Sequence, residues 1–295
     1  EIVFVNSEGN AGNLIADVHE GLYGETDLRF TSELPFDNVD VVFFCFGHGK
    51  SEAFLKEHNI PEHVKIIDFA QDFRLKDEGN DFVYGLPELQ RDKIRNARHI
   101  ANPGCFATCI QLGLLPLAAK KLLKGNVYIN AITGSTGAGV KPTAKTHFSW
   151  RSGNISIYKA FHHQHVPEIK QSICQLDPQF SGNIEFLPYR GDFPRGIFAT
   201  EMIYLDITQQ EIDDIYTDFY SDSPFTHYVT NEIDMKQVVN TNKCLVHAKR
   251  IDDKILITSC IDNLLKGAAG QAVENMNLLF GRSEDEGLHL KAIGF

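Results

Sequence analysis

The stretch VDVVFFCFG, residues 39–47, predicts a strand that is buried on both faces of a sheet. Its apolar residues are continuous rather than alternating, which is typical of parallel sheets that helices cover on both sides. VKIIDF (64–69) repeats the pattern, EIVFV opens the chain as a third run, and SEAFLKEHNI (51–60) predicts a short helix begun by a Ser51 cap. Strands that alternate with helices indicate βαβ units, and therefore an α/β domain with a doubly wound sheet whose ligands bind at the carboxyl ends of the strands.

The second half of the chain has a different pattern, which predicts a mixed sheet flanked by helices. Its expected strands are NVYINAIT before a glycine-rich loop, GIFATEMIYLDI (196–207) and KILITSCI (254–261). Its expected helices are TQQEIDDIYTDFY, where Thr208 and Glu211 have the spacing of a capping box, and the long run NLLKGAAGQAVENMNLLF (263–280).

The bulk composition is that of an ordinary globular protein. The chain has 295 residues, enough for two domains, with 43% hydrophobic and 23% charged residues. A formal net charge of −11 argues against nucleic acid or an anionic membrane surface as a partner, and no apolar run reaches the roughly 20 residues of a membrane span. Six cysteines without a CxxC pair predict reduced thiols and a cytoplasmic location.

Cys105 lies in HIANPGCFATCIQLGLLPL (99–117), directly after an Asn-Pro-Gly turn and before an apolar run. Pro103 and Gly104 make the turn, and the following residues predict a helix that Pro116 bends or ends. A sulfur at a helix N-terminus meets unpaired N–H groups, which favour the thiolate and predict a lowered pKa. The alternative is a small buried cysteine that only packs at the start of the helix.

The motif FHHQHVPEI (161–169) places two histidines just before a predicted helix that begins near Pro167. His163 and His165 face the same side in extended backbone, and they have three possible roles: metal ligand, general acid and base, or exposed polar residue. No further ligands with metal-binding spacing are present, so we expect no metal site. A cysteine nucleophile needs a proton acceptor, which makes Cys105 and His163 a plausible chemical pair.

Two loops are candidates for binding anions. TGSTGAG (133–139) follows a strand, and its glycines and hydroxyls would let backbone N–H groups approach a phosphate or carboxylate, although such loops are often only turns. YRGDFPRGI (189–197) carries Arg190 and Arg195, which either hold an anionic substrate or form a surface ion pair with Asp192.

These motifs together resemble the N-acyl-gamma-glutamyl-phosphate reductases of arginine biosynthesis. The resemblance rests on NPGCFAT with GLLP behind it, TGSTGAG, HQHVPEI, GDFPRGI and DNLLKGAAGQA, in that order along nearly the whole chain. One departure lies beside the nucleophile, where Cys109 replaces the glycine or alanine usual in the family. We expect Cys109 to be a small packing residue.

The resemblance implies an NADPH-binding Rossmann-type domain and an α+β catalytic domain similar to that of glyceraldehyde-3-phosphate dehydrogenase. It implies that Cys105 attacks the acyl phosphate and forms a thioester, with His163 as first choice for acid and base and His165 orienting it or binding substrate. Arg195 is then the candidate for the substrate anion. The implied cofactor contacts are Ser7, Phe46, Gly47, His48, Gly134, Ser135, Thr136, Gly137 and Asn263.

The family also has a first strand and glycine-rich loop for the pyrophosphate, and no GxGxxG motif occurs here. We therefore expect that an N-terminal piece of roughly 25 to 30 residues, about one βα unit, is missing and that the sheet lacks its central strand. The expected domains are residues 1–104, completed by 264–295, for NADP, and 105–263 for catalysis and homo-oligomerisation through its sheet. Rival interpretations are aspartate-semialdehyde dehydrogenase, a cofactor-free cysteine hydrolase or acyltransferase, and a non-catalytic binding protein.

Overall fold

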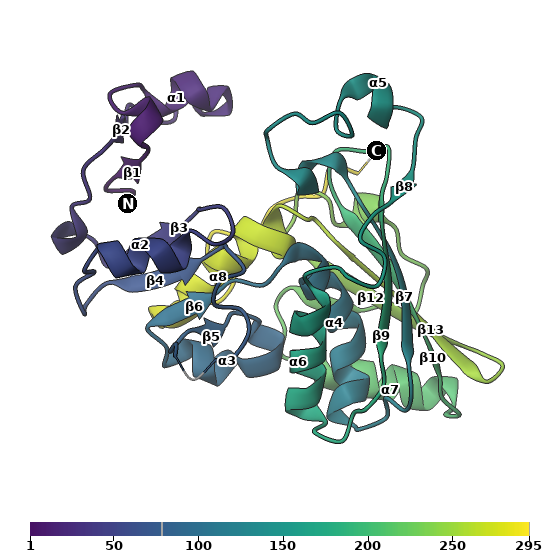
Figure 1. Cartoon of the computed structure of the whole chain (residues 1–295). Helices are drawn as coiled ribbons and strands as arrows, with labels where there is room; N and C mark the ends of the chain where they lie inside the picture. Colours follow the sequence, from purple (N-terminus) through teal and green to yellow (C-terminus); the bar gives the residue numbers. More distant parts are fainter. Residues whose placement is uncertain (78, 295) are drawn as a thin grey trace.

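The structure is a computed structural model that describes residues 1–77 and 79–294 (Figure 1). Its first part contains a four-stranded parallel sheet in the order β3-β4-β6-β5. The apolar runs at 39–47 and 64–69 form its β3 and β4, as their pattern predicts. The elements of this part are β3 (Val41–Phe44), α2 (Ser51–Glu57), β4 (Lys65–Asp68), β5 (Val83–Tyr84), α3 (Pro87–Arg95) and β6 (His99–Ala101), preceded by η3 (Phe36–Asn38).

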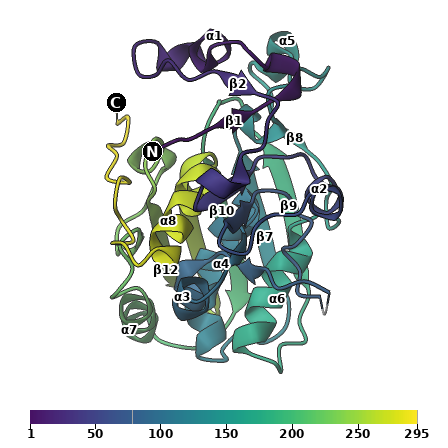
Figure 2. The same cartoon turned by 90° about the vertical axis from the view of Figure 1, so that its left-hand side faces the viewer.

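The first residues form a separate pair of parallel strands, β1 (Val5–Asn6) and β2 (Phe30–Thr31). Between them lie η1 (Glu8–Asn10), α1 (Ile15–Val18) and η2 (Glu20–Leu22), and Figures 1 and 2 show this segment at one end of the molecule. The prediction of a strand over residues 1–5 is wrong, because only Val5 pairs and the side chains of Ile2 and Val3 are exposed. Among the described residues no strand joins this pair to β3, so the Rossmann-type part has two sheets.

The second part is built on a seven-stranded mixed sheet in the order β11-β12-β13-β10-β7-β9-β8. β10 pairs antiparallel with both β7 and β13, whereas β7 and β9 run parallel. Alternate residues of β10 are buried under α4, α6 and α7, which lie on one face of the sheet (Figure 1). The bounds are α4 (Cys105–Ala119), β7 (Val127–Thr133), η4 (Ser135–Ala138), α5 (Phe148–Arg151), β8 (Ser156–Ile157), α6 (Val166–Leu176), β9 (Ile184–Arg190), β10 (Ile197–Tyr204), α7 (Gln209–Phe219), β11 (Thr226–Tyr228), η5 (Met235–Gln237), β12 (Cys244–Ile251) and β13 (Lys254–Ile261).

The helix α4 continues through Pro116 to Ala119 without ending at the proline. A proline has no N–H for the carbonyl four residues earlier, which here belongs to Leu112. The hydroxyl of Tyr220 donates to this carbonyl, and the hydroxyl of Tyr216 donates to the Gly113 carbonyl at 2.7 Å. Two tyrosines at the end of α7 therefore satisfy the backbone that the proline disturbs. The capping box of Thr208 and Glu211 at the start of α7 is present, as its spacing predicts.

The long helix predicted over residues 263–280 is present, and it begins with a π-helical turn. This turn, η6 (Leu265–Ala269), continues directly into α8 (Gly270–Leu279). Ala272, Leu278 and Leu279 of α8 pack with Ile67 and Ile100 of the four-stranded sheet. The C-terminal segment thus returns to the first part of the molecule, and η6 lies where the two parts meet.

Candidate active site

Cys105 is the first residue of α4, and two glycines make room for it. Gly104 is extended, and a Cβ on it would lie 2.7 Å from Arg74 Nη1 and against the His165 ring. A Cβ on Gly267, in the π-helical turn, would lie 2.9 Å from the Cβ of Cys105. Larger residues at either position would displace the groups around the sulfur.

The thiol of Cys105 is protonated in this environment. Burial raises the pKa of Cys105 to about 11, although Arg74 and the backbone N–H groups of Phe106 and Cys105 act in the opposite direction. The predicted lowering of the Cys105 pKa is therefore wrong, because loss of solvent outweighs the helix N-terminus. A nucleophilic role for Cys105 requires a nearby base that takes the proton as the sulfur attacks.

Two neutral histidines lie beside this thiol. The rings of His163 and His165 are 4.6 Å apart between centroids, and the residues are 4% and 6% exposed. Burial, followed by the charge of its neighbours, lowers the pKa of His163 to about 3 and that of His165 well below its usual value. His163 Nδ1 accepts the backbone N–H of His165 at 3.2 Å, which places the His163 proton on Nε2.

A buried carboxylate links His165 to the turn before Cys105. Glu168 Oε1 lies 3.9 Å from His165 Nε2 and 3.1 Å from Arg74 Nη1, while Oε2 accepts the Gly104 N–H at 3.0 Å and the Tyr84 hydroxyl at 2.9 Å. Arg74 also donates to the carbonyl of Asn102 at 2.9 Å. Glu168 and Arg74 thus fix the backbone on which the thiol stands.

The sequence analysis missed both of these residues. Glu168 lies on the buried stripe of α6 together with Ile169, Ser172 and Ile173. A glutamate on the buried face of a predicted helix could have been recognised in the sequence as a candidate functional residue. Arg74 gives no such signal, because it precedes its partner by 94 residues and stands in an irregular segment.

The glycine loop and Asn263 come together, as expected for a common site. Asn263 Nδ2 donates to Thr136 Oγ1 at 3.0 Å, and Asn263 Oδ1 accepts the Gly196 N–H at 2.7 Å. However, the N–H groups of Gly134, Ser135 and Thr136 bond to the carbonyls of Gly196, Phe193 and Pro194, and that of Gly137 bonds back to Gly134. The prediction that these N–H groups face an anion is therefore wrong, because the neighbouring loop already uses them.

Arg195 is neutralised by an internal partner. Its Nη2 lies 2.8 Å from Oδ2 of Asp262, a fully buried carboxylate. Asp192, the partner considered from the sequence, accepts the Gly153 N–H at 2.5 Å instead. The guanidinium of Arg195 thus holds the turn before η6, and its charge is compensated before any substrate arrives.

The FGHG turn, residues 46–49, follows β3, and its His48 lies in the neighbourhood of His165. Phe46 packs against Phe44 and Phe54, and His48 Nδ1 accepts the Gln71 N–H at 3.2 Å. The charge of His48 acts on the pKa of His165, so the two rings belong to one neighbourhood. Ser7, in contrast, bonds only within its own segment, to Asn10 and Thr31.

The carboxylate of Asp72 caps α2, in place of the predicted Ser51 cap. It accepts the N–H groups of Gly49, Ser51 and Glu52 at 2.7, 3.0 and 3.3 Å. The hydroxyl of Ser51 donates to Asp68 at 2.6 Å in the interior. The N-terminus of α2 is therefore already satisfied by a carboxylate of the protein.

Comparison with known proteins agrees with this arrangement. Residues 1–97 match the family model of the semialdehyde dehydrogenase NAD binding domain, and residues 105–263 match that of the semialdehyde dehydrogenase dimerisation domain. The chain is 62% identical over 295 residues to an N-acetyl-gamma-glutamyl-phosphate reductase of Bacteroides thetaiotaomicron, covering all of this chain and 92% of that one. A relative of the same name from Flavobacterium johnsoniae is 53% identical, at 100% and 91% coverage.

The chain belongs to the N-acetyl-gamma-glutamyl-phosphate reductase family. The fold is shared more widely: aspartate semialdehyde dehydrogenase II of Vibrio cholerae superposes with a TM-score of 0.69 at 17% identity, covering 94% of this chain and 90% of that one. The expected fold class, a Rossmann-type domain followed by an α+β domain, is confirmed.

Other expectations for this reductase family member concern metals, thiols and membranes. In residues 1–77 and 79–294 no group of three or more His, Cys, Asp and Glu side chains is arranged to hold a metal. The expectation that the protein has no metal site stays a prediction. All six cysteines are described and none is in a disulfide, and Cys109 is fully buried against Ser259. None of the helices in the described ranges has the length and hydropathy needed to cross a bilayer.

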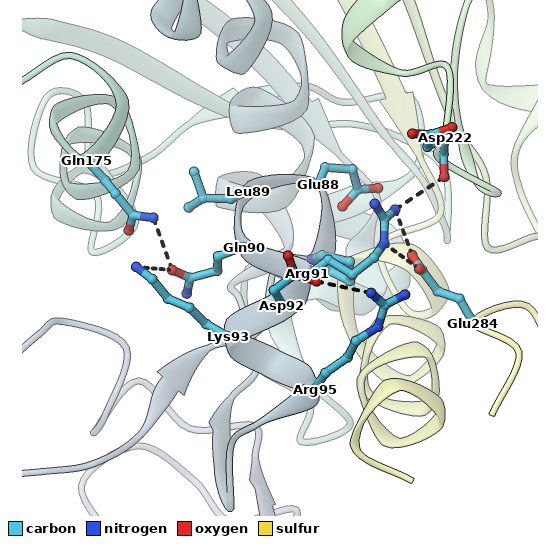
Figure 3. Close-up of a pocket in the computed structure, with 11 residues that line it drawn as sticks. Glu88, Leu89, Gln90, Arg91, Asp92, Lys93, Arg95, Gln175, Asp222 and Glu284 are labelled. Carbon is cyan, nitrogen blue, oxygen red and sulfur yellow. Dashed lines mark hydrogen bonds and ion pairs between the residues drawn. The ribbon is translucent and has the colours of Figure 1, made fainter. Parts of the chain in front are cut away.

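A cavity of about 670 Å³ lies elsewhere in the molecule, around α3 (Figure 3). Its polar groups bond to one another: Arg91 Nε lies 2.6 Å from Glu284, and Gln175 donates to Gln90 at 3.1 Å. None of its lining residues belongs to the Cys105 site. The lining residues are Pro87, Glu88, Leu89, Gln90, Arg91, Asp92, Lys93, Arg95, Gln175, Asp222 and Glu284.

Proposed function

We propose that this protein reduces an N-acyl-gamma-glutamyl phosphate to the N-acyl-glutamate 5-semialdehyde and phosphate, with NADPH and through a thioester on Cys105. The observation that carries the proposal is the half-buried thiol of Cys105, whose flanking residues Gly104 and Phe106 lie against two neutral histidines, with Glu168 joining His165 to Gly104. Relatives named for this reaction are up to 62% identical over the whole chain.

In this mechanism Cys105 Sγ attacks the acyl carbon while its proton passes to a histidine. The S–C bond forms, the carbonyl pair moves to oxygen, and re-formation of the C=O bond breaks the C–O bond to phosphate, which leaves with that electron pair. When bound, NADPH supplies the hydride. The protonated histidine gives its proton to the oxygen as the thioester is reduced, which forms a thiohemiacetal hydroxyl. The histidine then removes that proton, the C=O bond re-forms as the C–S bond breaks, and the sulfur takes the proton from the histidine as the semialdehyde departs.

The geometry favours His165 over His163 as the acid and base. His165 Nε2 stands against Gly104, whereas His163 uses Nδ1 to accept the His165 N–H. The Glu168 carboxylate, 3.9 Å from His165 Nε2, stabilises the imidazolium that forms when the thiol loses its proton. His163, preferred from the sequence, would orient its neighbour.

The residues present fit a dinucleotide between the FGHG turn and the glycine loop. Backbone at Gly47 and Gly49 has no other atom within 4 Å of a Cβ position, so a ligand can approach it closely. We assign Phe46, Gly47 and His48 to the cofactor, together with Ser7 at the end of β1. The assignment is completed by residues that line the site beside the reacting carbonyl and do not donate hydrogen bonds to an anion. They are Gly134, Ser135, Thr136, Gly137 and Asn263.

We also propose a cytoplasmic homo-oligomer in which the seven-stranded sheet forms the contact. Tyr128 and Tyr204 are 40% and 51% exposed on the face away from the helices, and Met202 and Leu256 beside them are half-buried. A second copy of this face would cover these apolar side chains. Residues 105–263 would then form the catalytic and oligomerisation domain, and 1–104 with 264–295 the NADP domain.

The test is an assay in the reverse direction with N-acyl-glutamate semialdehyde, phosphate and NADP, using acetyl and succinyl caps in parallel. Cys105→Ser is expected to abolish phosphate-dependent NADP reduction, because an alcohol cannot replace the thioester sulfur. His162→Gln, an exposed neighbour of the histidine pair, serves as the matched control. Retained activity of Cys105→Ser would contradict the covalent mechanism, and turnover of aspartate semialdehyde alone would favour the rival dehydrogenase.

A further inference from the structure

Arg190 stands out because its charge has no acidic partner. Neither Arg190 nor the nearby Arg151 lies within 4.0 Å of a carboxylate in residues 1–77 or 79–294, although Arg74 and Arg195 are both paired. The Nε atoms of Arg190 and Arg151 are buried and have no hydrogen-bond partner within the described chain. The half-buried guanidinium of Arg190 therefore carries a positive charge that no carboxylate compensates, although the protein has a net charge of −11.

Arg190 lies at the end of β9, between the segments that form the site. In the sheet it pairs with Thr133, which precedes the glycine loop, and with Ser156 of β8. Arg151, 5% exposed, donates to the hydroxyl of Ser156 at 3.3 Å. Both arginines therefore lie beside Ser156, where β8 pairs with the end of β9.

Tyr158 connects Arg190 with the reacting groups. The Arg190 guanidinium carbon lies 4.8 Å from the centroid of the Tyr158 ring, and that ring lies 5.7 Å from the ring of His163. Burial and then the Cys105 sulfur raise the pKa of Tyr158 to about 12, so its hydroxyl stays protonated close to the nucleophile. Arg74, not Arg190, is the cation that acts most strongly on the Cys105 thiol.

We propose that Arg190, supported by Arg151, binds a carboxylate of the substrate at the end remote from the acyl phosphate. This inference rests on the proposed function. The scissile carbon bonds to Cys105, and the rings of Tyr158 and His163 lie between Arg190 and that site, so Arg190 meets a part of the substrate beyond that carbon. A planar guanidinium held on a tyrosine ring is suited to a carboxylate, which it binds through two parallel hydrogen bonds. The carboxylate comes either from the glutamate α-position or from a dicarboxylic acyl cap.

The experiment measures the reverse reaction, in which the two substrate anions are added separately. Arg190→Met is expected to raise the KM for the semialdehyde about 10- to 100-fold, with the KM for phosphate and kcat nearly unchanged. Arg190→Lys should raise it less, because the charge remains while the two-pronged geometry is lost. Arg282→Met, which removes an exposed arginine, is the matched control.

The two carboxylate sources are separated by the acyl cap. An equal rise with acetyl and succinyl substrates assigns Arg190 to the α-carboxylate, and a rise confined to the succinyl substrate assigns it to the cap. A rise in the KM for phosphate alone, or no change in either KM, overturns the inference while the proposed function stands. If the wild-type protein turns over no N-acyl semialdehyde, the proposed function fails and this inference fails with it.

Discussion

Two buried ion clusters join the same two parts of this molecule, yet they differ in what they contact. In the first, Arg74 and Glu168 pair at 3.1 Å, and the carboxylate reaches Gly104 and His165. In the second, Lys266 lies 2.9 Å from Glu88 and 2.8 Å from Glu274, with all three side chains at most 1% exposed. Both clusters are shielded from water, so each would be strongly weakened by loss of one member.

The difference between the clusters lies in protonation and position. The first cluster pairs one cation with one carboxylate, and it contacts the histidine that is proposed to move a proton. The second has one ammonium for two carboxyl groups, of which Glu274 stays protonated at neutral pH because burial raises its pKa to about 8. Its other partners, Thr226 and Asn242, belong to the scaffold. The comparison indicates that the Arg74–Glu168 pair serves catalysis, whereas the cluster around Lys266 holds α3, η6 and α8 together.

The largest expected effect comes from Lys266→Met. It leaves the buried carboxylate of Glu88 without its cation and removes the donor to Glu274, so the free energy of unfolding should fall by about 3–5 kcal/mol. Urea denaturation measures this loss, and Lys56→Met at the exposed ion pair with Glu52 is the control, with an unchanged midpoint expected. The kcat of the molecules that remain folded should stay near the wild-type value. A kcat loss as large as that of a Glu168 variant would remove the distinction between the clusters.

Glu168→Gln is expected to lower kcat about 100-fold, because the imidazolium of His165 loses its neighbouring carboxylate. The uncompensated charge of Arg74 also lowers stability. Arg74→Met combined with Glu168→Gln removes both charges, and it should recover part of the unfolding free energy without recovering kcat. Glu185→Gln on β9 is the matched control. Recovery of kcat in the double variant would show that Glu168 matters only for stability.

The pH dependence of stability gives a smaller effect, which the second cluster supplies through Glu274. Burial, helped by Glu88, raises the pKa of Glu274 to about 8 from an unfolded value near 4.5. Because the folded state holds this proton more tightly, the stabilisation is complete below about pH 4.5 and is lost as the pH rises through about 8. The contribution of Glu274 to the free energy of unfolding should fall by at least about 1 kcal/mol between pH 5 and 8. The lowered pKa values of His163 and His165 act in the opposite direction over this range, so urea denaturation is compared between the wild type and Glu274→Gln. Glu274→Gln should remove most of that slope, and an unchanged slope would contradict the assignment.

The sequence could predict features that depend on near neighbours along the chain. The β3 and β4 runs, the start of α4 at Cys105 and the capping box of α7 all follow from local patterns, and their structures agree. Five ordered motifs also identified the family. These patterns are local because apolar periodicity and caps act over a few residues.

The features that could not be predicted depend on contacts between distant segments. The pKa of Cys105 follows from burial, which the approach of η6 and α6 creates, and the helix-end pattern alone gives the wrong direction. The N–H groups of the glycine loop are used by residues 193–196, which lie about sixty positions away. Arg195 likewise finds Asp262 rather than its sequence neighbour Asp192. In each case a long-range partner replaced the expected ligand or local partner.

The tyrosine hydroxyls that bond to the α4 backbone next to Pro116 imply an order of assembly. Cys105 lies at the start of α4, and the other end of that helix depends on Tyr216 and Tyr220, more than 100 residues further along the chain. A lone helix of this length with an internal proline is only marginally stable in water. During synthesis the helix that carries Cys105 is therefore stabilised only after α7 has left the ribosome. The pocket around the sulfur is completed later, after Gly267 has left it. The environment of the thiol is thus completed only after residue 267 is made, more than 160 residues after Cys105.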